Sequence, residues 1–450
     1  MAASMSFCKL SPGRKVAQQL PLDLPSDVPS EQPSDLPSNV PSELPSLQPT
    51  DSIWSQLGAD IDGEAAGDWS GRSVSLSADG RTVAVGAGAN DGAGANAGHA
   101  RVYRYDEVDS SWSQLGADID GEAADDRAGR SVSLSADGNT VAVGAYLNDG
   151  NGADAGHARV YRYVEVNSSW SQLGADIDGE AAGDQAGDSV SLSADGNTVA
   201  VGATFNDGNG ADAGHARVYR YDEGNLIWSQ LGADIDGEAA GDQAGDSVSL
   251  SADGNTVAVG AYLNDGNGAD AGHARVYRYD GVTSSWSQLG ADIDGEAAGD
   301  RAGRYVSLSA DGNTVAVGAN VNDGNGADAG HARVYRYVEV NSSWSWTQLG
   351  ADIDGEAAGD QAGFSVALSA DGNTVAVGAH RNDGNGADAG HARVYRYVEV
   401  NSSWSQLGAD IDGEAAGEQA GVSVSLSADG NTVAVGANVG RGRARVYTRN

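Results

Sequence analysis

Residues 128–145 read AGRSVSLSADGNTVAVGA, and this stretch decides the fold. Polar and apolar residues alternate over 131–135 and again over 140–144, which is the pattern of two β-strands. Asp137-Gly138 lies between them, and Asp-Gly is a strong signal for a tight hairpin turn. Two more alternating segments, 158–163 and 170–177, follow after connections rich in Gly, Asn and Asp. The stretch and its continuation therefore predict an antiparallel sheet of four short strands.

The same sheet recurs seven times along the chain. The segment WSQLGADIDGEAA, with Thr for Ser in one copy, begins at Trp54, Trp112, Trp170, Trp228, Trp286, Trp346 and Trp404. Successive copies are 58 residues apart, except for one step of 60. Four strands in a repeat of this length are typical of a β-propeller blade, whereas the coil of a solenoid is much shorter.

The phase of the repeats predicts a closed ring. The repeat region begins inside a fourth-strand segment, 53–61, and ends after a third-strand segment, 443–448. The first segment can therefore complete the last blade and remove its open sheet edge. We predict an all-β, seven-bladed β-propeller over about residues 53–449, within a domain that spans 51–450.

The repeat unit resembles the FG-GAP repeat, in the bacterial and algal type related to the propeller of integrin alpha subunits. The resemblance rests on the Gly-Ala that ends the second strand and on the glycine before the first strand, at Gly71, Gly129, Gly187, Gly245, Gly303, Gly363 and Gly421. The Phe and Pro of the family pattern are replaced. Integrin-type members bind calcium between the first two strands, but that loop is too short here to supply six to eight oxygens, so we do not expect that site.

The first 50 residues have a different composition from the repeats. All nine prolines lie there, and from Pro21 to Pro49 they recur every four residues. Such a segment has too little apolar surface to offset the loss of chain entropy on folding. We predict a leader of undefined role over 1–20, without the apolar stretch of a secretory signal, and a disordered, extended Pro/Ser-rich linker over 21–50.

Composition excludes several classes of function. The 450-residue chain has 64 acidic and 26 basic residues and a formal net charge of −38, which argues against nucleic-acid binding. No apolar run reaches the ~18–20 residues of a membrane-spanning helix. Cys8 is the single cysteine, so an intramolecular disulfide and a thiolate metal site are excluded. We expect a monomer that does not span a membrane.

The loop between the second and third strands is the candidate metal site. In the second repeat it reads NDGNGAD, with four side-chain oxygen donors and with glycines that permit tight turns. The donors in five repeats are Asn148, Asp149, Asn151, Asp154, Asn206, Asp207, Asn209, Asp212, Asn264, Asp265, Asn267, Asp270, Asn322, Asp323, Asn325, Asp328, Asn382, Asp383, Asn385 and Asp388. The hypothesis is Ca²⁺ binding, and the alternative is a solvated Asx-turn loop without metal.

Variable positions indicate a candidate ligand surface. One precedes the first strand and another follows the second strand, and strand direction places both on the same, acidic rim of the ring. The first set is Arg72, Arg130, Asp188, Asp246, Arg304, Phe364 and Val422. From the second set we predict ligand contacts for Tyr146, Phe205, Tyr262 and His380, because exposed aromatic residues stack on sugars or anchor protein partners. The alternative is simple drift of loop residues between repeats.

The motifs do not indicate an enzyme. Six histidines occupy one position of the repeat and are interpreted as structural: His99, His157, His215, His273, His331 and His391. The chain contains no nucleophile elbow, phosphate loop or HExxH pattern. The near-identity of the repeats also argues against an asymmetric active site, so we predict no catalytic residues.

Asn167, Asn341 and Asn401 each begin an Asn-Ser-Ser glycosylation signal, in the turn between the third and fourth strands. These signals favour the secretory route. Together, the patterns predict a non-enzymatic, extracellular or cell-surface binding or adhesion propeller, calcium-dependent, that presents its acidic rim to a glycan or protein ligand. The alternative is a structural cell-wall or matrix repeat protein without a specific ligand.

Overall fold

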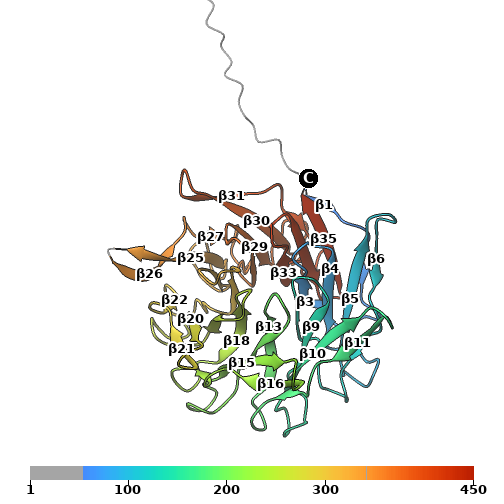
Figure 1. Cartoon of the computed structure of the whole chain (residues 1–450). Coiled ribbons are helices and arrows are strands. Elements are labelled where there is room, and N and C mark those ends of the chain that lie inside the picture. The colour runs from blue at the N-terminus through green and yellow to red at the C-terminus, as the bar shows by residue number, and fades with distance from the viewer. Residues whose placement is uncertain (1–53, 341, 450) are drawn as a thin grey trace, which may run out of the picture. The chain divides into compact units, whose positions relative to one another are not determined.

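The computed structural model describes residues 54–340 and 342–449, and the secondary structure of these residues is all β. The predicted leader and linker, 1–20 and 21–50, lie outside the described residues. Thirty-five strands form seven sheets, each with four antiparallel strands and a fifth, two-residue strand. Figure 1 shows the sheets arranged as blades around a central axis. The prediction of a seven-bladed β-propeller is confirmed.

Each blade begins with its innermost strand, and we number the blades 1 to 7 in chain order. The first strands are β3 (Ser70–Leu76), β8 (Ser131–Leu134), β13 (Ala186–Leu192), β18 (Ala244–Leu250), β23 (Tyr305–Leu308), β28 (Ser365–Leu368) and β33 (Ser423–Leu426). The second strands are β4 (Thr82–Ala87), β9 (Thr140–Ala145), β14 (Thr198–Ala203), β19 (Thr256–Ala261), β24 (Thr314–Ala319), β29 (Thr374–Ala379) and β34 (Thr432–Ala437).

The outer strands of the blades follow in the same order. The third strands are β5 (His99–Asp106), β10 (His157–Val164), β15 (His215–Asp222), β20 (His273–Asp280), β25 (His331–Val340), β30 (His391–Val398) and β35 (Arg443–Arg449). The fourth strands are β6 (Ser111–Gln114), β11 (Ser169–Gln172), β16 (Ile227–Gln230), β21 (Ser285–Gln288), β26 (Ser343–Gln348), β31 (Ser403–Gln406) and β1 (Trp54–Gln56). The fifth strands, which pair with the third strands, are β7 (Ile119–Asp120), β12 (Ile177–Asp178), β17 (Ile235–Asp236), β22 (Ile293–Asp294), β27 (Ile353–Asp354), β32 (Ile411–Asp412) and β2 (Ile61–Asp62).

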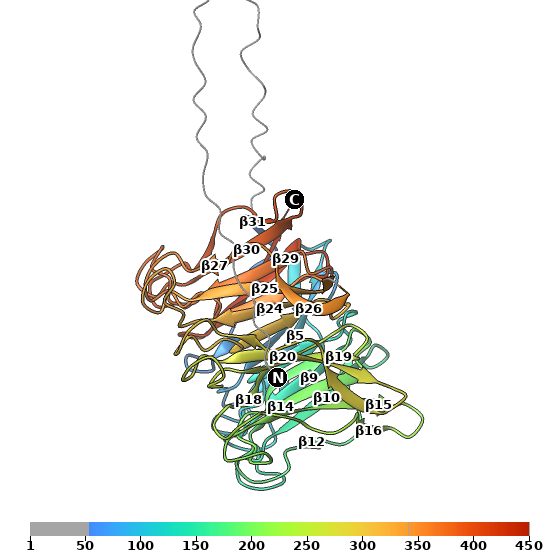
Figure 2. The ribbon, with the colours of Figure 1, turned by 90° about the vertical axis from the view of Figure 1, so that its left-hand side faces the viewer.

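The ring is closed by the start of the repeat region. β1 pairs antiparallel with β35, with Trp54 opposite Arg449 and Gln56 opposite Tyr447. β2 pairs with the same strand through Ile61 and Ala444. Blade 7 is therefore built from both ends of the described chain, as the phase of the repeats predicts. Figure 2 shows the ring from the side, with the sheet of blade 5 between those of blades 4 and 6.

The hydrophobic core lies between neighbouring blades. Val102 of β5 and Val141 of β9 are fully buried in one cluster that joins blades 1 and 2, and equivalent clusters join the other blades. Bulky residues fill the outer space, where the sheets diverge. Trp170 packs against Tyr163 with ring centroids 5.3 Å apart, and its indole Nε1 donates to the carbonyl of Leu115 in the preceding blade at 2.6 Å.

Serines of the innermost strands hold the blades together around the axis. Ser73 Oγ accepts a hydrogen bond from the backbone N–H of Val132 at 3.0 Å, and Ser75 Oγ accepts one from Leu134 at 2.9 Å. The alternating Ser-Val-Ser-Leu pattern therefore directs its serines toward the neighbouring blade. Small side chains permit this close approach, which leaves a narrow channel along the axis.

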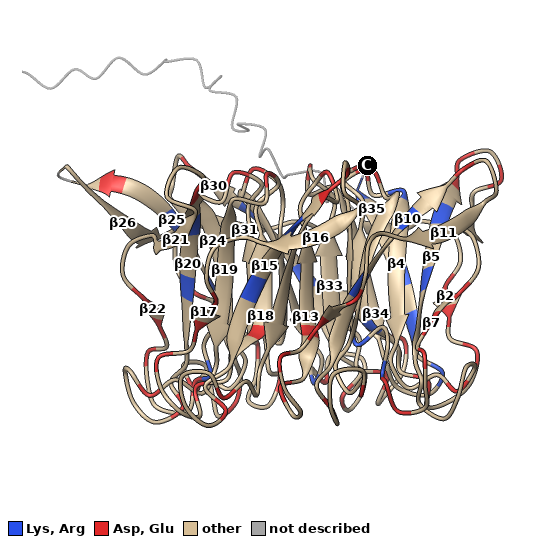
Figure 3. Cartoon of the chain, turned by 60° about the horizontal axis from the view of Figure 1, so that its bottom comes forward, with Lys and Arg blue, Asp and Glu red and all other residues tan. Residues whose placement is uncertain are grey.

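Two loops of each blade meet on one rim, as strand direction predicts. We name them the lead-in loop, before the first strand (121–130 in blade 2), and the Asn-Asp loop, after the second strand (146–156 in blade 2). Asn148 Nδ2 donates to Asp126 Oδ2 at 3.1 Å and so joins the two loops. Figure 3 shows Asp and Glu gathered in loops at the strand ends, with arginines along the strands. Within the described residues, no helix is long and apolar enough to cross a membrane.

Candidate functional site

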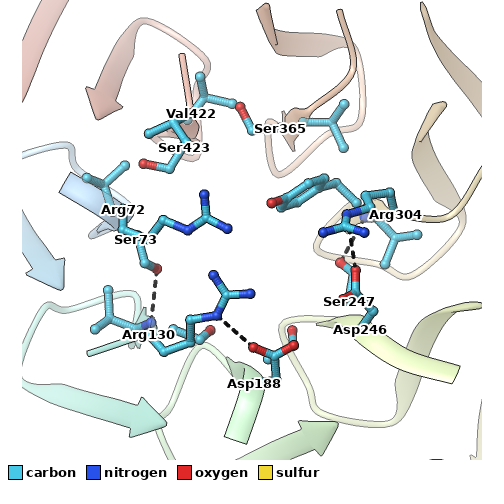
Figure 4. Close-up of a pocket in the computed structure, with 18 residues that line it drawn as sticks. Arg72, Ser73, Arg130, Asp188, Asp246, Ser247, Arg304, Ser365, Val422 and Ser423 are labelled. Atoms are coloured by element: carbon cyan, nitrogen blue, oxygen red, sulfur yellow. Dashed lines mark hydrogen bonds and ion pairs between the residues drawn. The ribbon is translucent and has the colours of Figure 1, made fainter. Parts of the chain in front are cut away.

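A cavity of about 200 Å³ lies on the axis of the ring and is lined by residues of all seven first strands and of the positions just before them. We name it the channel site. Its polar lining comprises Arg72, Arg130, Asp188, Asp246, Arg304, Tyr305 and serines of the innermost strands. Figure 4 shows the three arginine side chains directed toward the centre. A cavity of this size holds several water molecules or one small ligand.

A repeated glycine delivers these side chains to the axis. Gly129 has a φ of 83°, which favours glycine, and a Cβ there would collide with the carbonyl oxygen of His99 in blade 1. The backbone of blade 2 therefore passes close to blade 1, and the next residue, Arg130, enters the channel site. Every repeat has this turn, so the residue after the glycine always lines the axis or lies beside it.

The charges of the channel site do not cancel. Arg130 Nε donates to Asp188 Oδ1 at 2.7 Å, and Arg304 Nε lies 3.7 Å from Asp246 Oδ2. Arg72 forms no ion pair and no side-chain hydrogen bond with any described residue. Three guanidinium groups thus face two carboxylates, and one positive charge is left without a partner.

Burial changes the acidity of two of these groups. It raises the pKa of Asp246 to about 6, and the nearby carboxylate of Asp188 acts in the same direction while Arg304 opposes it. Burial also lowers the pKa of Arg72, helped by the positive charge of Arg130. The site therefore combines a carboxyl group that titrates near neutral pH with an unpaired guanidinium.

Two tyrosines pack against arginines of the channel site. The guanidinium of Arg304 lies 4.3 Å from the ring centroid of Tyr262, and that of Arg130 lies 5.4 Å from the ring of Tyr146. Such cation–π contacts orient the guanidinium groups. The tyrosine that follows a second strand therefore packs against an arginine that precedes a first strand. Tyr146 and Arg130 both belong to blade 2, whereas Tyr262 of blade 4 contacts Arg304 of blade 5.

The predicted ligand-binding residues are therefore less exposed than expected. Tyr146 and Tyr262 are half-buried, and His380 is only 6% exposed. The His380 ring lies 3.9 Å from that of Phe364, and burial, together with Arg381 and Arg72, lowers the pKa of His380 to about 3. Phe205 is half-buried, and its backbone N–H donates to Asp184 O at 3.3 Å. Tyr146 and Tyr262 contact arginines of the channel site, whereas His380 packs on Phe364, whose ring lies 5.8 Å from the guanidinium of Arg72.

The sequence pattern alone did not show the role of the first variable set. It placed these residues on the rim, although five of the seven are charged and together line one cavity. It also missed Tyr305, which stands where the other repeats have Ser and packs against Phe364 at 5.1 Å. That single Ser-to-Tyr difference was the available signal.

The side chains of the Asn-Asp loops are occupied within the protein. Asn148 Oδ1 accepts from Gly150 N at 2.8 Å, and Asp149 Oδ1 accepts from Asp154 N at 2.9 Å. Asn151 Nδ2 donates to the carbonyl of Gly179 at 2.7 Å and so fastens the loop to the next lead-in loop. This is the arrangement of the Asx-turn alternative. Calcium binding at these loops stays a prediction.

A second kind of polar cluster recurs beside the third strand. Glu64, His99 and Asp118 offer ligand atoms within 4.8 Å of one another, and equivalent triads follow in the next blades, so these clusters could hold a metal. In blade 1, Arg101 Nη2 lies 2.6 Å from both carboxylates. Burial lowers the pKa of His99, which is therefore neutral near pH 7.

The glycosylation signals lie in turns between the third and fourth strands. Asn167 and Asn401 are exposed there, whereas Asn341 lies outside the described residues. Glycosylation of all three stays a prediction.

No protein-family model matches the chain, and a search of curated proteins finds no match. Solved structures do match. The periplasmic gluconolactonase PpgL of Pseudomonas aeruginosa has 19% identity and a TM-score of 0.51, covering 76% of this chain and 85% of that chain. A Bacteroides uniformis protein, described as a candidate 6-phosphogluconolactonase, has 14% identity and a TM-score of 0.50 with the same coverage. At these identities the likeness establishes the propeller fold alone. The resemblance to FG-GAP repeats stays a prediction.

These comparisons correct the predicted function. Both matched propellers carry lactonase names, so the prediction of a non-enzymatic binding or adhesion propeller is corrected, because this fold also carries enzymes. The expectation that near-identical repeats do not form an asymmetric site was also wrong. The scaffold repeats, but the residue after the glycine differs from blade to blade, and the ring collects these differences in one asymmetric cavity.

Proposed function

We propose that the protein is a hydrolase that opens a small lactone, with its reaction centre in the channel site. The observation that carries this proposal is Arg72, an arginine that lines the cavity without a carboxylate partner in the described structure. A guanidinium held away from water costs free energy unless an anion compensates it. A developing oxyanion or a bound anionic group supplies that compensation.

Asp246 is the candidate general base. Its pKa of about 6 leaves it mostly ionised near neutral pH while making it more basic than an ordinary aspartate. Arg304, 3.7 Å away and packed on Tyr262, holds the carboxylate in place. Water attacks the lactone carbonyl and gives its proton to Asp246, Arg72 stabilises the oxyanion, and the ring C–O bond breaks as the alkoxide takes the proton back.

The names of the matched structures decide which substrates to test first. One is a gluconolactonase and the other is described as a candidate 6-phosphogluconolactonase. We further propose that this enzyme acts outside the cytoplasm, because one matched structure is periplasmic and Asn167 and Asn401 are exposed in glycosylation signals.

The test follows proton release during hydrolysis of glucono-1,5-lactone and of its 6-phosphate, with the spontaneous rate subtracted. We expect the full chain to accelerate one of them and Arg72→Gln to lower kcat/KM about 100-fold, as removal of an oxyanion donor does. Arg81→Gln is the control, because Arg81 is exposed on the opposite rim, where its guanidinium pairs with Glu107. Full activity of Arg72→Gln, or no acceleration of either lactone, overturns the proposal.

A further inference from the structure

The triads beside the third strands fall into two groups that differ in one arginine. In blade 3, the guanidinium of Arg217 pairs with both Glu180 and Asp234, donating to the two Asp234 oxygens at 3.1 and 3.3 Å. That cation already pairs with both carboxylates next to His215. Blades 1, 2 and 4 have the same arrangement.

In blade 6, the arginine is turned away from the triad's aspartate. Arg393 Nη2 donates to the backbone carbonyl of Asp354 at 2.7 Å, and Nη1 lies 3.4 Å from Glu356 Oε1. Within the described residues, no arginine pairs with Asp410, whose only side-chain partners are Gln406 and His391. In blades 1 to 4 an arginine guanidinium lies beside the equivalent aspartate. In blade 6 no described arginine takes that position beside Asp410.

A fourth ligand joins this cluster in blade 6. Nδ1 of His391 lies 3.8 Å from Asp410 Oδ2, 4.0 Å from Glu356 Oε2 and 4.0 Å from Asp412 Oδ1. The imidazole is 1% exposed, and neither ring nitrogen has a hydrogen-bond partner. The buried Nδ1 faces three carboxylates without a hydrogen-bond partner, and a cation bound there would accept its lone pair.

We propose that Glu356, His391, Asp410 and Asp412 bind one divalent transition metal ion of the Zn²⁺ type. One imidazole nitrogen and carboxylate oxygens are ligands that Zn²⁺ accepts, at about 2.0–2.2 Å from the metal. Tetrahedral ligands at that distance are roughly 3.3–3.6 Å apart, so the spacings of 3.8–4.0 Å between His391 Nδ1 and the three carboxylates need only a small contraction. The carboxylates have room to make it, because Asp410, Asp412 and Glu356 are 28%, 45% and 48% exposed.

This site does not depend on the proposed lactonase activity. Its histidine begins β30 and pairs in register with Asp412 of β32, on outer strands of blade 6, whereas the channel site is built on innermost strands. The triad of blade 5 shares the turned arginine, Arg333, but within the described residues His331 has no second aspartate within 4.0 Å. We therefore place the tight site in blade 6.

The experiment is equilibrium dialysis of the full chain against Zn²⁺, with millimolar Mg²⁺ and Ca²⁺ present to suppress weak binding to the acidic surface. We expect one tightly bound Zn²⁺ per chain. His391→Ala removes it, whereas the matched variant His215→Ala, in the arginine-filled triad of blade 3, retains it. Tight binding that survives His391→Ala, or more than one tight equivalent per chain, overturns the proposal.

A second pair of variants tests the site even if the histidine variants misfold. Asp412→Asn alters a half-exposed side chain and should weaken Zn²⁺ binding at least about tenfold. Asp236→Asn, the same position in blade 3, should leave it unchanged. Absorption of the Co²⁺-loaded protein provides the readout of coordination, and an unchanged spectrum in Asp412→Asn excludes Asp412 as a ligand.

Discussion

At the scale of the residue, burial changes the acidity of Asp246 in the channel site. Its side chain is 10% exposed, and burial raises its pKa from an ordinary value of 3.8 to about 6. The folded state therefore binds this proton more tightly than the unfolded chain does. Its contribution to stability is fully present below about pH 3.8 and is lost as the pH rises through about 6.

We expect lactone hydrolysis to follow the opposite trend, because a general base acts only when ionised. The kcat/KM of the wild type should rise with pH through about 6, and Asp246→Asn should lose that rise and most of the activity. The measurement is the pH profile of kcat/KM for both proteins. A profile that keeps the same rise in Asp246→Asn would assign the base to another group.

The same substitution should change the pH dependence of stability. As the pH rises from below about 4 to above about 6, the wild type should lose up to about 3 kcal/mol of unfolding free energy that Asp246→Asn, which cannot ionise, does not lose. Urea unfolding at several pH values measures the difference. Parallel curves for the two proteins would show that Asp246 keeps an ordinary acidity.

At the scale of the element, the outer hairpin of each blade is tied to the preceding blade by a tryptophan. Trp170 Nε1 donates to Leu115 O at 2.6 Å, and the same bond recurs around the ring. The two extra residues of the 60-residue step lie in the outer hairpin of blade 5. β25 and β26 are longer than their counterparts, and the extra Trp344 stacks on Tyr337 at 5.3 Å while remaining 54% exposed.

We expect Trp170→Phe to cost about 1 kcal/mol of unfolding free energy, because it removes the indole donor and leaves the Leu115 carbonyl without it. Trp344→Phe is the control, since within the described residues its indole donates no hydrogen bond, and it should be nearly neutral. The midpoints of urea unfolding compare the two. Equal effects would show that packing of the aromatic side chain, and not the hydrogen bond between blades, determines how much Trp170 contributes to stability.

At the scale of the whole molecule, closure of the ring depends on β2 as well as β1. Ile61 of β2 is 5% exposed, and so is Ile177 of β12, which lies between blades 2 and 3. Only Ile61 belongs to the segment that completes blade 7. A closed ring makes these two positions equivalent. An opened ring would leave Ile61 without a core to join.

Both Ile61→Ala and Ile177→Ala should therefore destabilise the protein by a similar amount, about 2–4 kcal/mol each, because each removes a buried side chain and leaves a cavity. Chemical unfolding of the full-length variants measures this. A neutral Ile61→Ala beside a destabilising Ile177→Ala would contradict closure by the N-terminal segment.

The sequence alone determined the blade, the number of blades and the way the ring closes. These features are local or periodic: the alternation over 131–135, the Asp137-Gly138 turn and the seven spaced tryptophans all act through neighbours in the chain. It also predicted that the lead-in and Asn-Asp loops share a rim. Antiparallel strand direction requires that, without any knowledge of side-chain contacts.

Only the tertiary structure decided where the chemistry lies. Arg72, Asp246 and Arg304 are far apart in the chain and looked like drifting loop residues, but the turn at each glycine brings them into one cavity. Likewise, His215 and His391 occupy the same repeat position, yet they differ in whether an arginine pairs with the neighbouring aspartate. Periodicity specifies a scaffold, whereas a site depends on which unlike side chains the closed ring places within contact distance.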